Sequence, residues 1–180
     1  PCGGAPYCSA SSKKPNFSCA SSLLILSALL WYSNDFGSTI ALDPAGNIIV
    51  TGQFRDSVDF DPGVGKFKMK SIYNDVFILK LDNSGHFKWA RNMGARGGNS
   101  TIWLPIIADA GGNIYSAGWF EKTLDIDPDT TVFNLTSAGV WDAYISKLDS
   151  SGIFVWGKRI GGIEQDYASS LALDAAGNLL

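Results

Sequence analysis

The sequence predicts an all-β protein assembled from repeated units of four antiparallel strands. Three observations support this class. A set of motifs returns about every 66 residues, each repeat contains two tight-turn signals, and no stretch of the repeats shows the 3.6-residue apolar period of a helix. A fixed period of tens of residues is typical of repeat architectures, in which each unit packs on its neighbours.

The repeat is clearest in a Gly-Asn-apolar triplet. The triplet begins at Gly46, Gly112 and Gly177, so the steps are 66 and 65 residues. Two further motifs recur in the same order: DxDP at 59–62 and 125–128, and DVFILKLD at 75–82 with DAYISKLD at 142–149. The second unit has one extra residue between these two motifs, so we expect a loop in that connection.

Each unit also carries two copies of the pattern Asp-x-x-Gly. The pattern begins at Asp43, Asp82, Asp109, Asp149 and Asp174. An aspartate can accept a hydrogen bond from the backbone two residues on, and glycine takes the left-handed conformation that closes a three-residue hairpin loop. Each copy therefore predicts a hairpin, and two hairpins per unit predict four strands.

Strand-like segments flank these turns. They are Ser38–Leu42, Asn47–Phe54, Asp75–Leu81, Phe87–Met93 and, in the second repeat, Phe154–Ile160. A four-stranded antiparallel unit that repeats along the chain is typical of a β-propeller blade. The main rival is a tandem array of β-sandwiches, which would need roughly seven strands per domain.

We therefore expect a β-propeller fragment with two blades and part of a third. The boundaries are 33–97 for one blade, 98–163 for the next, and 164–180 for the start of a truncated third. Residues 1–32 are atypical, since they hold all three cysteines and an apolar run that is shorter than the about 20 residues of a membrane span. This segment is either a signal-like leader or a degenerate preceding blade.

The composition limits the classes of function. With 46% hydrophobic and 17% charged residues, the chain is too apolar to be disordered. Its net charge of −3 gives no reason to expect nucleic acid or an anionic membrane as partner. Of the 17 acidic residues, 15 are aspartate, a residue that favours turns and strand ends over helices.

The ordered motifs resemble a known family, the SBBP repeats, which are named for a seven-bladed β-propeller. The first unit contains GNIIVTGQF, VDFDPG and DVFILKLD, and the second contains GNIYSAGWF, LDIDPD and DAYISKLD. The resemblance covers about residues 34–180, with departures at Asp129, which replaces the glycine of DPG, and at Thr101. It implies a propeller in a secreted or cell-surface bacterial protein, and it implies no particular reaction.

The DxDP motif offers the clearest candidate metal ligands. Two aspartates separated by one residue lie on the same side of an extended strand, about 6 to 7 Å apart. Ca²⁺ takes about 6 to 8 oxygen ligands, and carboxylates are common among them. The candidate calcium ligands are Asp59, Asp61, Asp75, Asp125, Asp127 and Asp142. The alternative is that these aspartates terminate strands and cap turns, as those of Asp-x-x-Gly do.

Aromatic residues provide a candidate ligand-binding position. Trp89 and Trp156 recur at equivalent positions and alternate with phenylalanine, which predicts core packing. Trp119 stands where the first repeat has Gln53, so it is the better candidate for a surface that binds a ligand. The single histidine, His86, is expected to be exposed in a turn.

No catalytic set stands out in the sequence, so we expect a non-enzymatic module that acts as a scaffold, in adhesion or in ligand binding through its loop face. Its partners would be neighbouring blades of the same chain and an extracellular protein or polysaccharide. No cofactor is expected apart from calcium. The alternative is a carbohydrate-active or other hydrolytic enzyme with its active site at the mouth of the propeller channel, in blades outside this sequence.

Overall fold

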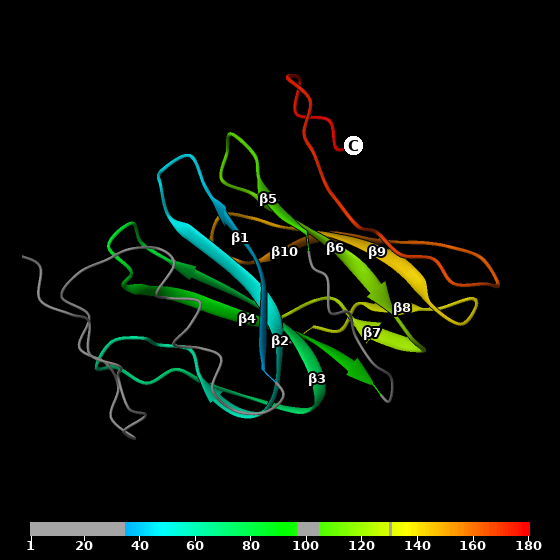
Figure 1. Ribbon diagram of the computed structural model, residues 1–180, viewed down its shortest axis with the longest axis horizontal. Coiled ribbons are helices and arrows are strands. Elements are labelled where there is room, and N and C mark those ends of the chain that lie inside the picture. The colour runs from blue at the N-terminus through cyan, green and yellow to red at the C-terminus, as the bar shows by residue number, and fades with distance from the viewer. Residues whose placement is uncertain (1–34, 97–104, 130) are drawn as a thin grey trace, which may run out of the picture.

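A computed structural model describes residues 35–96, 105–129 and 131–180, and all regular secondary structure in this part is β-strand. The strands form antiparallel sheets, which confirms the all-β prediction (Figure 1). Their bounds are β1 Phe36–Leu42, β2 Ile48–Asp59, β3 Lys68–Leu81, β4 Phe87–Arg96, β5 Ile106–Ala108, β6 Ile114–Phe120, β7 Thr123–Asp125, β8 Asn134–Thr136, β9 Asp142–Leu148 and β10 Phe154–Ile160. The predictions for residues 1–32 lie outside the described residues.

The first unit consists of β1 to β4, which pair in sequence order as an antiparallel meander. The strands β2 and β3 are longer than predicted. After a register shift between Phe54 and Asp56, they continue as a hairpin through the pair Asp59↔Lys68. The loop predicted between the DxDP motif and residue 75 is therefore shorter than that connection in this unit, because β3 already begins at Lys68 and only residues 60–67 lie outside the strands.

The second unit consists of β5, β6, β9 and β10, with the sheet order β10-β9-β6-β5. Here the hairpin that carries DxDP forms two short strands of its own, β7 and β8, which do not belong to this sheet. The extra residue lies in the segment 137–141 between β8 and β9, which is bent, whereas the matching part of the first unit belongs to the continuous strand β3. The insertion thus marks a loop in the second unit, as predicted.

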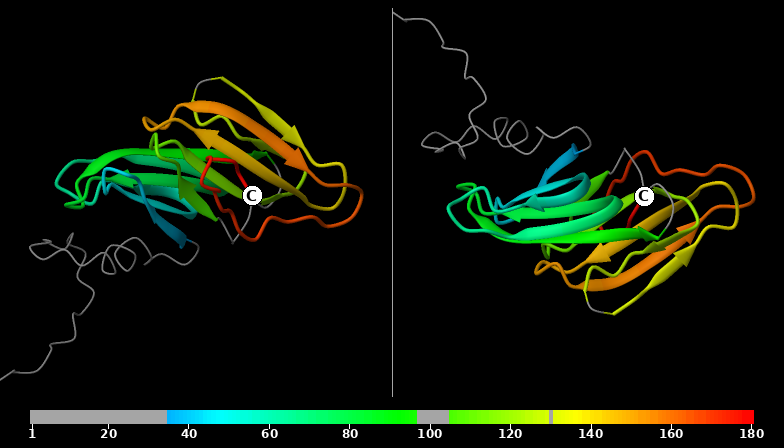
Figure 2. Two further views of the ribbon diagram at one scale, coloured as in Figure 1. Left: turned by 90° about the horizontal axis from the view of Figure 1, so that it is seen from above. Right: turned by 90° about the horizontal axis from the view of Figure 1, so that it is seen from below.

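The separated hairpin joins the two units through the backbone. The strand β7 pairs with the end of β4, with the partners Gly94↔Asp125, Ala95↔Leu124 and Arg96↔Thr123. The first sheet is thereby extended to the order β1-β2-β3-β4-β7-β8. Figure 2 shows the two sheets as adjacent layers, and the described strands do not close into a ring.

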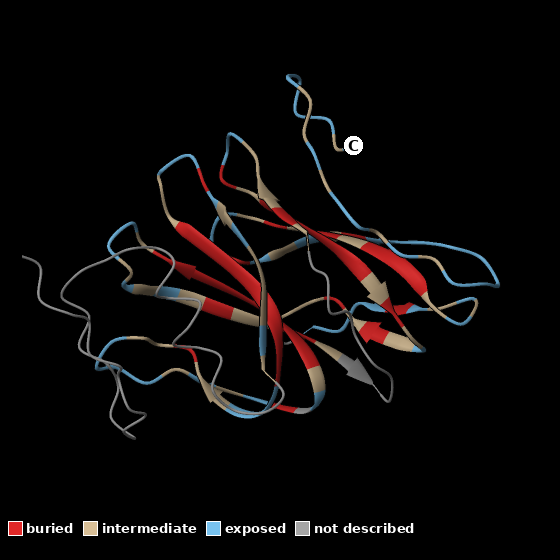
Figure 3. Cartoon of the chain, in the orientation of Figure 1, coloured by how far each residue is buried: buried red, intermediate tan, exposed pale blue. Residues whose placement is uncertain are grey.

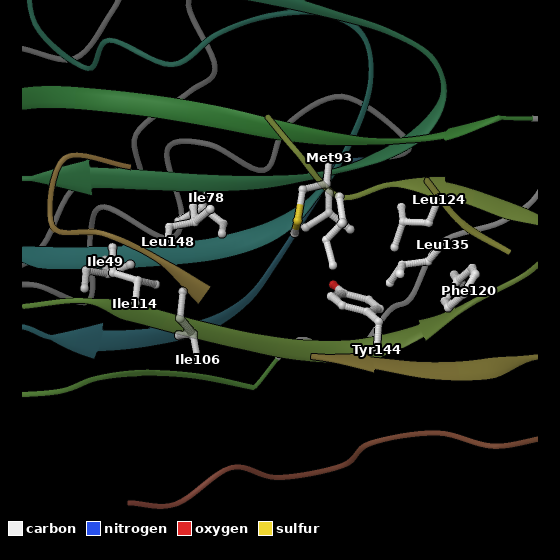
Figure 4. Close-up of a cluster of buried hydrophobic side chains, with 12 residues drawn as sticks. Ile49, Ile78, Met93, Ile106, Ile114, Phe120, Leu124, Leu135, Tyr144 and Leu148 are labelled. Carbon is white, nitrogen blue, oxygen red and sulfur yellow. The ribbon is translucent and has the colours of Figure 1, made fainter. Parts of the chain in front are cut away.

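The core lies mainly between these two sheets. Buried residues concentrate on the central strands (Figure 3). We call the cluster between the sheets the interunit core (Figure 4); it contains Ile49, Val76, Ile78 and Met93 from the first unit and Ile106, Ile114, Phe120, Leu124, Ile126, Leu135, Tyr144 and Leu148 from the second. A second cluster on the other face of the first unit is rich in aromatic rings, such as Phe54, Phe60 and Phe77. Burial of such apolar surface is the main favourable term that holds the units together.

All five Asp-x-x-Gly turns have the predicted geometry. In the first, the Asp43 carboxylate accepts hydrogen bonds from the backbone N–H groups of Ala45 and Asn47, both at 2.9 Å. The turn glycine donates its N–H to the aspartate carbonyl in every copy. The glycine φ angles are 77° at Gly46, 86° at Gly85, 77° at Gly112, 82° at Gly152 and 81° at Gly177.

No helix among the described residues is long and apolar enough to cross a membrane.

The turn glycines allow a matched test of packing between the units. A Cβ at Gly152 would lie 3.1 Å from atoms of the Trp89 ring, whereas a Cβ at Gly46 would meet nothing closer than 3.9 Å. Both glycines have a positive φ angle, so replacing either one with alanine should lower the free energy of unfolding by about 1–2 kcal/mol. Gly152→Ala should lower it by about 1–3 kcal/mol more than Gly46→Ala, because the added Cβ overpacks against the Trp89 ring. Urea unfolding of the two variants measures this difference, and equal losses of unfolding free energy would contradict the contact between Gly152 and Trp89.

Candidate functional site

Three Asp-x-x-Gly turns meet around a pocket of about 670 Å³ at one end of the two units. Two of them are the first turns of the two units: the first unit contributes Pro44 and Ala45, and the second contributes Ala110, Gly111 and Gly112. The third is the second turn of the second unit, which contributes Ser150 and Ser151. The side chains of Lys80, Lys88 and Trp89 complete the lining. The pocket thus lies across the junction between the units, and turn backbone supplies much of its wall.

A buried ion pair stabilises one side of the pocket. The Lys80 Nζ lies 2.9 Å from Asp43 Oδ2, and these side chains are only 3% and 4% exposed. The same Nζ donates a hydrogen bond to the Ser150 carbonyl of the second unit, at 3.0 Å. Lys80 on β3 therefore links a first-unit turn to a second-unit turn.

The environment of Asp43 keeps it ionised. Burial raises the pKa of its carboxyl group, but hydrogen bonds from Asn47 and Lys80 outweigh that effect and lower the pKa to about 2. The Asn47 Nδ2 donates to Asp43 Oδ2 at 2.7 Å. The carboxylate therefore remains an acceptor for the turn and for Lys80 across the ordinary pH range.

Trp89 occupies the boundary between the pocket and the interunit core. Its ring lies 5.9 Å from Lys80 Nζ and 5.7 Å from Arg91 Cζ, distances at which cations interact with the face of an indole. Arg91 Nε donates to the Gly152 carbonyl at 3.1 Å. The prediction that Trp89 packs in the core is confirmed, since its side chain is partly buried against the interunit core.

Few titratable side chains line this pocket. The titratable side chains that line it are Asp43, Lys80 and Lys88. Asp43 and Lys80 are paired with each other, and Lys88 is exposed. Glycoside hydrolysis commonly uses two carboxylates on either side of the bond, and the described lining holds only one. The wall instead offers turn backbone, two serines and an aromatic side chain.

The DxDP aspartates cap their own loops. Asp59 Oδ1 accepts hydrogen bonds from the N–H groups of Asp61 and Phe67, at 3.2 and 2.9 Å. Asp125 Oδ1 makes the same two contacts in the second unit, with Asp127 and Phe133 at 3.4 and 3.0 Å. The turn-capping alternative therefore describes the geometry of both motifs.

The predicted calcium ligands do not come together. Asp142 Oδ2 accepts a hydrogen bond from Ala138 N at 2.8 Å and pairs with Arg159. Asn92 Nδ2 donates to Asp75 Oδ2 at 3.2 Å. Within the described ranges, no group of three or more histidine, cysteine or acidic side chains is placed to hold a metal ion. The loops at Asp59 and Asp125 fold back on these aspartates, whereas Asp75 and Asp142 lie on strands and accept from the side chains of Asn92 and Arg159 on neighbouring strands.

The other predicted positions have different surroundings. Trp119 does not stand alone on the surface, since it stacks on Trp141 with ring centroids 4.6 Å apart. Trp141 is held in turn by a 2.7 Å hydrogen bond from its Nε1 to Glu121. His86 is 79% exposed, as expected of a turn residue. The pocket itself was missed, because its walls belong to turns that are up to 108 residues apart in the sequence.

The chain is similar to two known proteins over much of its length. It is 31% identical over 134 residues to the regulatory protein FlaEY of Caulobacter vibrioides, an alignment of 74% of this chain and 14% of that protein. It is 28% identical over 125 residues to the uncharacterized WD repeat-containing protein L264 of Acanthamoeba polyphaga mimivirus, covering 62% of this chain and 8% of that protein. No family model matches the chain. The chain therefore spans a small part of each relative.

Because the ion pair is buried, removing one partner should destabilise the protein more than removing both. Lys80→Met leaves the Asp43 carboxylate buried without its cation and should destabilise the protein by about 3–5 kcal/mol. The double variant Asp43→Asn/Lys80→Met should recover part of this loss. Lys88→Met is the control, since its exposed cation should contribute less than about 0.5 kcal/mol. Urea unfolding of the parent, both single variants Asp43→Asn and Lys80→Met, the double variant and Lys88→Met measures these losses. A loss in the double variant equal to the sum of the two single losses would show that the pair is not coupled.

The lowered pKa of Asp43 also predicts a dependence on pH. The folded pKa of about 2 lies below the ordinary value of 3.8, so ionisation favours the folded state. Its contribution is complete above pH 3.8 and is lost as the pH falls toward 2. Asp43→Asn should therefore lose less unfolding free energy than the parent protein between pH 5 and about 2. Parallel curves for the two proteins in urea titrations would contradict the assignment.

Proposed function

We propose that this chain is a non-enzymatic, ligand-binding segment of a β-propeller in a secreted or cell-surface bacterial protein. The architecture supports this proposal. Each unit has a four-stranded antiparallel core, and the units pack face to face through the interunit core. Four strands per repeat is also the pattern of a WD40 propeller blade, and one relative is named a WD repeat-containing protein. The SBBP-like motifs lie on these strands and on their connections.

The observation that carries the binding proposal is the open pocket where the turns of two units meet. Binding sites in propellers are expected on loops that several blades bring together. In this pocket the Asp149–Gly152 turn is fixed against the first unit, because Lys80 and Arg91 hydrogen-bond to its carbonyls. A preformed site of this kind loses little conformational entropy when it binds a ligand.

The pocket wall suggests the class of ligand. Backbone groups of the turns, together with Ser150 and Ser151, offer hydrogen bonds to a hydroxyl-rich molecule, and Trp89 offers apolar surface. The exposed Lys88 adds one positive charge at the rim. A neutral or weakly acidic extracellular polysaccharide is the class of ligand whose hydroxyl groups, apolar ring faces and charge best match these groups.

A glycan array tests this proposal, followed by calorimetry with the best oligosaccharide. Ala110→Trp adds a large side chain at an exposed turn position on the pocket wall. Ala175→Trp is the matched control, because Ala175 is the equivalent exposed residue of the Asp174 turn and does not line the pocket. We expect Ala110→Trp to weaken binding at least about tenfold and Ala175→Trp to leave it unchanged. Absence of glycan binding, or equal loss in both variants, would overturn the proposal.

A further inference from the structure

The hairpin at the far ends of β2 and β3 carries a row of exposed lysines, which we call the lysine row. Its members are Lys66, Lys68 and Lys70. The residues between them, Phe67 and Met69, pack against the second apolar cluster of the first unit, so the lysines project from the opposite side of the chain. Within the described part of the chain, no member of the lysine row takes part in an ion pair.

The backbone of this segment forms an open edge of the sheet. Residues 68–71 pair with β2 on one side, whereas β4 pairs with β3 only farther along the strand. Phe60 donates its N–H to the Phe67 carbonyl at 2.8 Å, and hydrogen-bonded and non-hydrogen-bonded pairs alternate along an antiparallel ladder. Lys68 and Lys70 therefore occupy non-hydrogen-bonded pairs, so their own N–H and C=O groups point away from β2 toward the open edge.

The second unit shows that a neighbouring unit leaves this edge uncovered. In the equivalent hairpin, the neighbour pairs with β7, and β8 remains the last strand of the sheet. Asn134 and Thr136 on β8 take the places of Lys68 and Lys70, and both are exposed. By the same junction, a unit that precedes the first one would pair with residues 57–59 and leave the lysine row open.

The lysine row does not belong to the repeat. The second unit has Val132, Asn134 and Thr136 at the equivalent positions, and its hairpin forms the same strand pairs without a cation. Lysine can protect an edge strand from unwanted pairing, but the equivalent edge of the second unit carries no such protection. The row therefore adds a property that the fold does not require, a line of positive charges about 6 to 7 Å apart beside unpaired backbone.

We propose that an extended acidic segment of a partner protein adds to this edge as an antiparallel strand. Antiparallel addition follows the pairing of all strands in both described sheets. The added strand hydrogen-bonds to the N–H and C=O groups of Lys68 and Lys70, and its own residues lie directly opposite them. Aspartate or glutamate at alternate positions then faces the lysine row, and opposite charges in cross-strand pairs stabilise the contact.

The surroundings leave the lysines available for this contact. Asp59 lies opposite Lys68 on the other strand of the hairpin, but its Oδ1 accepts hydrogen bonds from the backbone of its own loop. The lysine row is also at the opposite end of β2 from the Asp43 turn, which lines the pocket. Strand addition here is therefore independent of the proposed polysaccharide binding.

Fluorescence anisotropy with a short labelled peptide, in which glutamate and threonine alternate, tests the contact. The peptide should bind the parent chain, and added salt should weaken the binding. Lys68→Glu should raise the dissociation constant at least about tenfold, because a cross-strand attraction becomes a repulsion. Lys70→Glu is a second variant with the same expectation. Lys158→Glu reverses the charge of an exposed lysine on β10, so it is the matched control and should leave the affinity unchanged.

Modified peptides separate strand addition from simple attraction between charges. Methylation of the glutamate backbone nitrogens removes the N–H groups that face Lys68 and Lys70, so it should abolish binding. Methylation of the threonine nitrogens, which point away from the edge, should preserve binding. A peptide with lysine in place of glutamate should bind the Lys68→Glu chain more tightly than it binds the parent chain.

Several outcomes would overturn the proposal. They are no binding of the acidic peptide to the parent chain, equal losses in Lys68→Glu and Lys158→Glu, and equal effects of the two methylations. Displacement of the peptide by an acidic polysaccharide at the same carboxylate concentration would also do so, because it would show a site for any polyanion. Circular dichroism checks that each variant is folded. Ala110→Trp should leave the affinity for the peptide unchanged, so this proposal and the polysaccharide pocket can fail separately.

Discussion

Each Asp-x-x-Gly turn depends on one carboxylate that accepts two backbone hydrogen bonds, and the remaining architecture is arranged around these turns. At Asp43 the acceptor also binds Asn47 and Lys80, so a local turn becomes part of a buried network. Lys80 then reaches the Ser150 carbonyl of the next unit. The Asp43 carboxylate that shapes the hairpin thus also helps, through Lys80, to fix the position of one unit relative to the other.

The interunit core and the turn contacts act together. Apolar side chains such as Ile78, Met93 and Tyr144 exclude water between the sheets, but this attraction has little directional preference. Lys80 and Arg91 add directed hydrogen bonds to specific carbonyls, and β7 adds backbone pairing with β4. The relative position of the two units is therefore set by polar contacts at the edges of an apolar interface, and the pocket is a consequence of that position.

Repetition and binding are closely connected in this molecule. Trp89, which recurs as Trp156, packs against the interunit core and also lines the pocket. The proposed polysaccharide pocket arises from this feature, since its walls are turns and the side chains that hold one of them.

The sequence by itself determined the five turns and the strands that flank them, because those signals are local. An aspartate and a glycine three residues apart define a hairpin wherever they occur, and period-two alternation defines the strands beside it. Only the tertiary structure decided that the DxDP hairpin of the second unit crosses to the first sheet and that Trp119 stacks on Trp141. It also decided that no three of the candidate calcium ligands gather at one site in the described part of the chain. These outcomes depend on contacts between residues that are distant in the sequence. A repeat pattern shows which positions of the units are equivalent, but it does not show which residues contact each other.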